Sequence, residues 1–407
     1  MRILTIHNRY QYRGGEDESS EAEDNLLRDR GHEVLRYEVS NSKIVPRNYV
    51  RVGLQTVYSP VSYKEIRTAL VKFRPEVAAI QNFFPLVSPA AYFACVREHV
   101  PVVQTLRNYR LLCPNAMFFR DGAVCENCLG KSVPWPGIVH GCYRGSIAAT
   151  AAVASMISVH HLMKTWERRI SLYVALSEFS RKKFVEGGLP ASKIVVKPNF
   201  VYPDPGYSSE PGSFALFVGR LTKEKGVETL IAAWRKLKTK SVLRIVGDGP
   251  LEEHVISACR ECPGIRYEGR LAVKDVYGMM GAANVVIVPS EWYETFGRVV
   301  VEAFAKGTPA LVSNLGAVAE LVEPGRTGWQ FRAGDSEHLA ATLDRILADP
   351  QASAAMRPAV RAEYVLKYTA ETNYRMAMDI FEIARGNLAN AVGSSARSGM
   401  IRRTTPP

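Results

Sequence analysis

The 407-residue sequence lacks the motifs that are typical of several function classes, and each missing motif disfavours its class. No Gly-x-Gly-x-x-Gly fingerprint opens its first predicted helix, which disfavours a dinucleotide-dependent dehydrogenase. There is no zinc-finger signature, no aromatic-rich motif of a sheet-type RNA-binding domain and no helix-turn-helix pattern, so we expect no nucleic-acid partner. The first ten residues, MRILTIHNRY, are too polar and their apolar run is too short for a secretory signal, and they predict a β-strand instead.

Cysteine is scarce, with seven residues in the chain. Without an export signal we expect the protein in the cytoplasm, or peripheral on the inner face of the membrane, where cysteines remain thiols or bind metals. One stretch contains a Cys-x-x-Cys pair and two outlying cysteines, a pattern that predicts a structural zinc site. Reduced thiols or a local disulfide are the alternatives, and no catalytic role is expected. The four residues are Cys113, Cys125, Cys128 and Cys142.

Acidic residues are too few to balance the basic ones, and the formal net charge is +12. Residues 101–200 alone hold 13 Lys and Arg against 5 Asp and Glu. Such an excess suits an anionic partner, either a nucleotide or an anionic membrane surface, although a solvated basic face is the alternative. Gly145–Met163 has no charged residue but is too polar for a spanning helix. We expect this segment and the basic cluster Arg181–Lys183 to lie near a membrane surface; the alternative is a helix buried against a sheet.

The chain is too long for one ordinary core and suits an α/β fold with two Rossmann-like domains that face each other across a cleft. A strand, a loop with Gly14 and Gly15, a helix and a second strand form a βαβ opening, which is typical of a doubly wound parallel sheet. A proline-rich stretch that cannot continue a helix or a central strand separates the halves. We predict a first domain over residues 1–198, a linker over 199–213, a second domain over 214–362, a helix over 363–386 that returns to the first domain, and a disordered tail over 387–407.

Polar groups follow two early strands of the predicted second domain, at the edge where open α/β sheets bind ligands. Arg220 and Lys225 come after the strand Phe214–Val218. Two cations near a helix N-terminus suit a diphosphate, although loop cations are more often solvated. Gly247 and Asp248 follow the next strand, where glycine allows a close backbone approach to a ligand or a plain turn.

A third segment, VPSEWYETFGRVVVEAFAKGTP, indicates the chemistry most directly. Glu294 lies in the loop after a strand, and Phe296 and Gly297 precede a helix that contains Glu302. Backbone N–H groups at the start of this helix are open to a phosphate. One carboxylate can accept both hydroxyls of a ribose, and the other can hold a sugar. Because Glu302 has apolar neighbours on both sides, a purely solvated helix face is not expected.

Taken in order, these motifs resemble those of glycosyltransferase family 4, and the similarity covers about residues 1–385. The resemblance implies the GT-B architecture and retaining transfer of a hexosyl group from a nucleoside diphosphate sugar, of the UDP or GDP type, to a glycan or lipid-linked acceptor. It implies that Arg220 and Lys225 hold the diphosphate, that Glu302 binds the ribose and that Glu294 contacts the donor sugar. The Gly14–Gly15 loop would close over the phosphates. No Asp-x-Asp pair occurs in the chain, in agreement with a family that needs no metal cofactor for catalysis.

The remaining motif residues are expected around the donor, with one departure from the family pattern. Gly247, Asp248, Phe296 and Gly297 keep the pattern. Family members often carry a His after the strand that corresponds to residues 101–106, and this chain has Arg107, which we expect to contact the donor in its place. Because of this departure, a non-catalytic protein that binds a sugar nucleotide or a polysaccharide is one alternative function. A sugar-nucleotide epimerase of the same fold is a second alternative.

Overall fold

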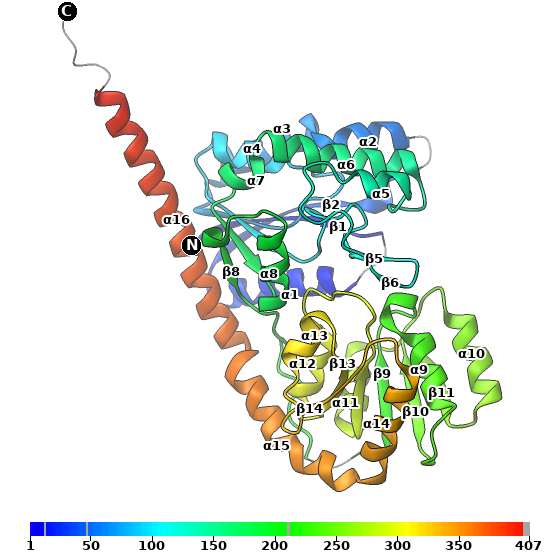
Figure 1. The fold of residues 1–407 in the computed structure, drawn as a ribbon. Coiled ribbons are helices and arrows are strands. Elements are labelled where there is room, and N and C mark those ends of the chain that lie inside the picture. Colours follow the sequence, from blue (N-terminus) through cyan, green and yellow to red (C-terminus); the bar gives the residue numbers. More distant parts are fainter. Residues whose placement is uncertain (12–13, 46–47, 210–211, 402–407) are drawn as a thin grey trace, which may run out of the picture.

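The computed structural model describes residues 1–11, 14–45, 48–209 and 212–401, which form two parallel sheets of six strands each, covered by helices (Figure 1). Both sheets are parallel throughout, so each must be buried on its two faces. The α/β class expected from the sequence is confirmed.

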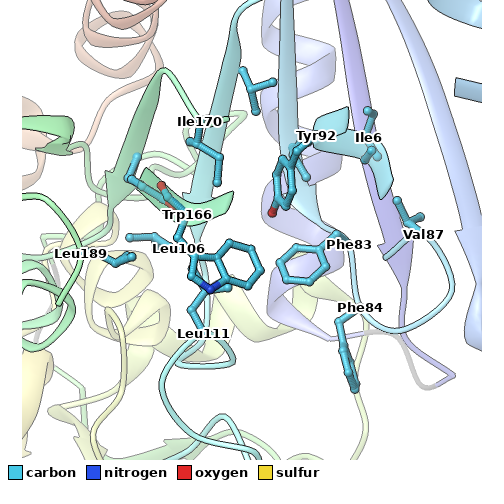
Figure 2. Close-up of a cluster of buried hydrophobic side chains, with 14 of the residues drawn as sticks. Ile6, Phe83, Phe84, Val87, Tyr92, Leu106, Leu111, Trp166, Ile170 and Leu189 are labelled. Atoms are coloured by element: carbon cyan, nitrogen blue, oxygen red, sulfur yellow. The ribbon is translucent and has the colours of Figure 1, made fainter. Parts of the chain in front are cut away.

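The first sheet has the strand order β2-β1-β3-β4-β7-β8. Alternate residues of its strands enter two separate cores, because side chains point to opposite faces along a strand. Leu4 and Ile6 belong to a core with α3 (Pro60–Phe73), α4 (Ala90–Arg97) and α6 (Ile147–Leu162), whereas Ile3 belongs to a core with α1 (Gly15–Asp29) and α16 (Ala370–Ile401). Figure 2 shows part of the first core, with Trp166 and Phe83 at its centre. The strands are β1 (Arg2–Arg9), β2 (Glu33–Ser40), β3 (Val77–Asn82), β4 (Val102–Leu106), β7 (Leu172–Ala175) and β8 (Ile194–Val196).

Besides α16, the eight α-helices α1 to α8 accompany this sheet in the described part of the chain, together with a two-stranded ribbon of β5 (Phe119–Arg120) and β6 (Ala123–Val124). The helices are α1 (Gly15–Asp29), α2 (Tyr49–Val57), α3 (Pro60–Phe73), α4 (Ala90–Arg97), α5 (Trp135–Val139), α6 (Ile147–Leu162), α7 (Thr165–Arg168) and α8 (Glu178–Glu186).

The second sheet has the order β11-β10-β9-β12-β13-β14, in which the chain reverses direction across the sheet between β9 and β12. Such a switch point is where open α/β sheets bind their ligands. The edge strands β11 and β14 were not expected from the sequence, because half-exposed residues such as those of IRYEG give little apolar signal. The strands are β9 (Phe214–Val218), β10 (Val242–Val246), β11 (Ile265–Gly269), β12 (Val285–Val288), β13 (Ala310–Ser313) and β14 (Gly328–Phe331).

Helices cover both faces of the second sheet, with α11, α12 and α15 in one core and α9, α10 and α14 in the other. The helices are α9 (Val227–Trp234), α10 (Glu252–Glu261), α11 (Val273–Ala282), α12 (Arg298–Ala305), α13 (Gly316–Leu321), α14 (Ser336–Ala348), α15 (Pro350–Lys367) and α16 (Ala370–Ile401). None of the helices in the described ranges is long and apolar enough to cross a bilayer.

The C-terminal helical region differs from the single helix that the sequence predicts over 363–386. Thr369 separates α15 from α16 and accepts a hydrogen bond from the backbone N–H of Thr372, as a helix cap does. Helix α16 runs along the first domain, where Phe381 packs with Ile3 and Val77 (Figure 1). The helix continues to Ile401, into the segment for which we expected disorder, and residues 402–407 lie outside the described residues.

Candidate functional site

The carboxyl ends of the two sheets meet at the loop between β12 and α12. Thr295 in this loop donates a hydrogen bond from its hydroxyl to the carbonyl oxygen of Arg107, at 2.9 Å, just after β4. Its own carbonyl oxygen accepts a hydrogen bond from the hydroxyl of Ser177, which follows β7, at 2.9 Å. Tyr293 packs edge-to-face against Phe179 of α8. The loop that carries Glu294 is therefore in contact with both domains.

Lys225 and Glu294, which lie 69 residues apart in the sequence, form an ion pair at the switch point. Lys225 Nζ lies 2.8 Å from Glu294 Oε1, and the Ser290 hydroxyl donates to the same oxygen. Burial would raise the pKa of Glu294, but Lys225 and the hydrogen bond from Ser290 outweigh it and lower the pKa. Glu294 is thus a buried carboxylate that stays ionised and can accept hydrogen bonds.

Glu302 takes part in a second charged cluster, which joins the two domains. Nε of Arg298, at the start of α12, lies 2.8 Å from Glu302 Oε1. Its Nη1 lies 2.8 Å from Glu18 Oε2 in α1. Burial raises the pKa of Glu302, since Arg298 offsets only part of the desolvation and Glu18 adds repulsion. Burial and the nearby Glu302 raise the pKa of Tyr277 to about 12.

The Gly14–Gly15 loop lies against this cluster from the side of the first domain. The carbonyl oxygen of Gly15 is 3.4 Å from an Arg298 nitrogen. Asp17 accepts a hydrogen bond from the backbone N–H of Gly14 at 3.1 Å and also contacts His7 Nε2 at 2.7 Å. Because His7 and Asp17 are fully buried, they fix the start of α1 rather than face a ligand.

Two glycines of the second domain permit a close approach of neighbouring backbone segments. Gly226 has φ of 69°, and a Cβ there would lie 1.9 Å from the Pro289 carbonyl oxygen. Gly247 has φ of 139°, and its Cβ would lie 1.9 Å from the Gly219 carbonyl oxygen. No other residue type fits either position without movement of the main chain, so the loops after β9, β10 and β12 are held close together.

The other predicted residues of the second domain differ in their surroundings. Arg220 is exposed and its side chain has no ion pair within the described ranges, so it is available to an anion. Asp248 is exposed beside Arg270, with 3.5 Å between the charged atoms. Phe296 is buried and packs against Tyr368, so its side chain belongs to the core rather than to the predicted donor site. Gly297, with φ of 119°, caps α12 in a conformation that favours glycine.

The Arg107 side chain, which the family resemblance implies as a donor contact, is buried in a hydrogen-bond network. Its guanidinium donates to Gln81 Oε1 at 2.8 and 3.0 Å and to Asn199 Oδ1 at 3.0 Å, and it lies 3.3 Å from Glu23 Oε1. Lys197 binds the same Glu23 oxygen at 2.8 Å. A contact between Arg107 and the donor would require this buried network to open, so the geometry favours a structural role.

The four clustered cysteines line one small pocket, between the β5–β6 ribbon and α5. Burial and the three neighbouring thiols raise the pKa of Cys128 to about 11. Within the described ranges, no three His, Cys, Asp or Glu side chains are arranged to hold a metal ion. The zinc site stays a prediction.

Sequence reasoning missed the residues that join the two domains at this site. Arg298 lies inside the motif segment, and its spacing of four from Glu302 on a helix indicates an ion pair, so this contact was within reach. Glu18 had no signal in the sequence, because its partner lies 280 residues away. Within the first domain, Glu16 was also missed; its pKa is raised by burial, and it accepts a hydrogen bond at 3.3 Å from Asn108, which lies 92 residues away in the sequence.

Comparison with known proteins agrees with these motifs. Residues 206–363 match the family model for glycosyl transferases group 1. The chain is 34% identical over 163 residues to glycogen synthase of Mycobacterium tuberculosis, a match that covers 39% of each protein. It is 31% identical over 198 residues to phosphatidyl-myo-inositol mannosyltransferase of Mycobacterium leprae, which covers 46% of this chain and 52% of that protein. The matches thus span between two fifths and about half of these relatives.

The structural comparison extends over both domains. The crystal structure of Anabaena Alr3699/HepE in complex with UDP is similar with a TM-score of 0.68, over 94% of this chain and all of that chain, at 18% identity. At this identity the similarity establishes the fold. The protein therefore has the two-domain GT-B fold, and residues 206–363 in its second domain are similar to group 1 glycosyltransferases.

Proposed function

We propose that this protein transfers a hexosyl group from a nucleoside diphosphate sugar to a glycan or lipid-linked acceptor, with retention of configuration and without a catalytic metal. The observation that carries the proposal is the Lys225–Glu294 ion pair, which is located at the switch point of the second sheet with the exposed Arg220 on the same loop as Lys225. The match of residues 206–363 to glycosyl transferases group 1 supports it.

Each side chain has a role that follows from its charge and surroundings. Lys225 and Arg220 would neutralise the charge that develops on the departing diphosphate, as a divalent metal does in other enzymes. Glu294, held ionised by Lys225, would accept hydrogen bonds from hydroxyls of the donor sugar. Glu302 would accept hydrogen bonds from the ribose, and Arg298 would hold its carboxylate in place. The structure of Alr3699/HepE contains UDP, which favours a uridine donor for the first tests.

The proposal is tested with the purified protein and a panel of UDP and GDP sugars. Nucleotide binding is measured by thermal shift, and donor turnover is followed by NMR, which also reports the anomeric configuration of the product. We expect turnover in the presence of EDTA, and its loss in Lys225→Met and Glu294→Gln. Lys223→Met is the matched control, because Lys223 lies exposed in the same short helix, Lys223–Lys225. Inverted product, or turnover that needs a divalent ion, would contradict the proposal.

The buried Arg107 network favours a second candidate function, a protein that binds a sugar nucleotide without turnover. Arg107 replaces the side chain that the family resemblance places near the donor sugar, and its guanidinium is occupied by Gln81, Asn199 and Glu23. Tight binding of a donor with no turnover against any acceptor, and no slow hydrolysis, would favour this candidate.

A further inference from the structure

The outer helical layer of the first domain exposes an unusual amount of apolar surface. Among the described side chains of α2, α5 and α6, seven large hydrophobic ones are more than half exposed, and Leu162 and Val50 reach 83% and 81%. Isolated apolar residues are common on protein surfaces, but a contiguous set marks an interaction site. We call this set the α2–α6 face: Tyr49, Val50, Leu54, Trp135, Val139, Ile147 and Leu162.

The three helices form one continuous layer, so these side chains belong to a single surface. Gly53 of α2 lies against Ala152 of α6, where an added Cβ would be 3.6 Å from that side chain. His160 near the end of α6 binds the carbonyl oxygen of Val57 in α2 at 2.8 Å. The Ser132 hydroxyl, just before α5, lies 3.4 Å from His161. Figure 1 shows α2, α5 and α6 together on the outer side of the first domain, away from the second.

Helix α6 is half buried, which explains the absence of charges between residues 145 and 163. Val153, Met156 and Ile157 lie in the core of the first domain. Ile147 and Leu162 lie on the opposite side and are 61% and 83% exposed. The sequence left open whether this helix is buried or lies at a membrane surface, and the structure shows that a buried side and an exposed apolar side coexist.

The charges around the α2–α6 face have one sign. Residues 41–64 and 127–166, which contain all three helices, have no Asp or Glu. Arg51, Lys131, Arg144 and Lys164 are exposed within these segments. Glu126 immediately precedes the second segment, but it is already paired with Lys183 and does not neutralise these cations. An apolar surface with basic residues and no acids is complementary to an anionic lipid bilayer.

We propose that the α2–α6 face binds the surface of a bilayer that contains anionic lipid. The apolar side chains would enter the headgroup region, and each basic residue near the surface would increase affinity roughly fivefold. The binding itself does not depend on the proposed function; only its benefit does, because it would bring the first domain to a lipid-linked acceptor. Such docking would hold the protein at the membrane without a spanning helix.

The basic cluster Arg181–Lys183, which the sequence analysis placed at the same membrane surface, is not part of this face. It lies on α8, whose N-terminal N–H groups bind Glu320 of the second domain. Arg181 pairs with Glu178 at 2.6 Å and Lys183 with Glu126 at 2.7 Å, so two of its charges are already balanced. The expectation for this cluster is therefore replaced by the α2–α6 face.

The test is flotation of the full chain with two kinds of vesicle. One contains phosphatidylcholine alone, and the other also contains about 30 mol% phosphatidylglycerol, which gives it a negatively charged surface. We expect binding to the anionic vesicles that weakens as salt increases. Leu54→Ser/Leu162→Ser and Arg51→Gln/Lys164→Gln should each reduce binding at least about tenfold. The matched control is Val365→Ser/Leu366→Ser, because these exposed apolar residues lie on α15, in the second domain, and should leave binding unchanged.

The outcomes separate this inference from the proposed function. Absence of flotation at low salt, or equal losses in the control variant, would overturn it. Lipid-free dimerisation that Leu54→Ser/Leu162→Ser abolishes would also overturn it, because the occupant would then be a second copy of the chain. Thermal shift with UDP, measured on every variant, reports folding and the nucleotide site separately. Flotation without any nucleotide binding or turnover would leave the inference standing while the proposed function fails.

Discussion

The substitution Lys225→Met removes the ammonium group that lies 2.8 Å from the carboxylate of Glu294, a buried residue that is only 8% exposed. The substitution keeps most of the side-chain volume, so the loss of charge is the main perturbation. Loss of one partner of a buried ion pair costs about 3–5 kcal/mol, and the partly exposed Lys225 places this case near about 3 kcal/mol. For a domain of this size that corresponds to a decrease of roughly 6–12 °C in Tm.

The pH dependence gives the sharper test. The pKa of Glu294 is lowered in the folded protein, so its ionised form stabilises the fold above the unfolded pKa of about 4.3. This contribution is lost as the pH falls through the folded pKa. In Lys225→Met burial dominates and raises the pKa, so the carboxylate destabilises the fold at neutral pH and is relieved by protonation. The difference in Tm between the two proteins should therefore be largest near neutral pH and shrink toward acid.

The assay is calorimetric unfolding between about pH 4.5 and 8, the range that spans the ordinary Glu pKa and neutrality, combined with donor turnover at neutral pH. We expect turnover to fall by about two to three orders of magnitude, the usual effect of removing one group that stabilises transition-state charge. Lys225→Met/Glu294→Gln should be more stable than Lys225→Met, because it leaves no unpaired carboxylate. A Tm difference that does not vary with pH, or a double variant no more stable than the single one, would refute the reasoning.

Three further predictions concern other parts of the site. Arg298→Met should lower stability by about 3 kcal/mol, because it leaves the two carboxylates that it joins in partial burial; urea unfolding measures this. Gly247→Ala should be destabilising by several kcal/mol through its clash with a carbonyl oxygen, whereas Gly278→Ala, in the open middle of α11, should gain about 0.5–1 kcal/mol. If the four cysteines bind zinc, elemental analysis should find about one zinc per chain that Cys125→Ser removes. A metal-free, stably folded protein would leave these residues as thiols.

Much of the fold could be predicted because parallel sheets have a simple sequence signature. The strands Leu172–Ala175 and Phe214–Val218 were delimited correctly from apolar runs, since they are central strands between two layers of helices, and the short apolar run Ile194–Val196 delimited an edge strand correctly as well. The edge strand Ile265–Gly269 was missed because its residues, IRYEG, are mostly polar and form no apolar run. The local pattern therefore identified strands that contain an apolar run, including Ile194–Val196 at an edge, and failed where the run is absent.

In the candidate site, the sequence predicted the positions of residues but not the directions of all their side chains. The sequence located Lys225 and Glu294 on their loops, and the parallel register of β9 and β12 then brings those loops together. The direction of a side chain could not be predicted in the same way, because it depends on partners that lie outside the motif. The guanidinium of Arg107 is turned toward Gln81 and Glu23, residues from a strand and a helix that no local pattern links to it.

The same reasoning explains why Arg298 is more informative than its place in the motif suggests. A cation at the start of α12 weakens the helix dipole's attraction for a phosphate, so its presence there needs a compensating reason. That reason is the pair of carboxylates it joins, one at the predicted ribose site and one on α1 beside the Gly14–Gly15 loop. A nucleotide that binds Glu302 would compete with or reinforce this bridge, and in either case its binding energy would be coupled to the contact between the domains. Donor binding and domain orientation are therefore expected to respond together when Arg298 is replaced.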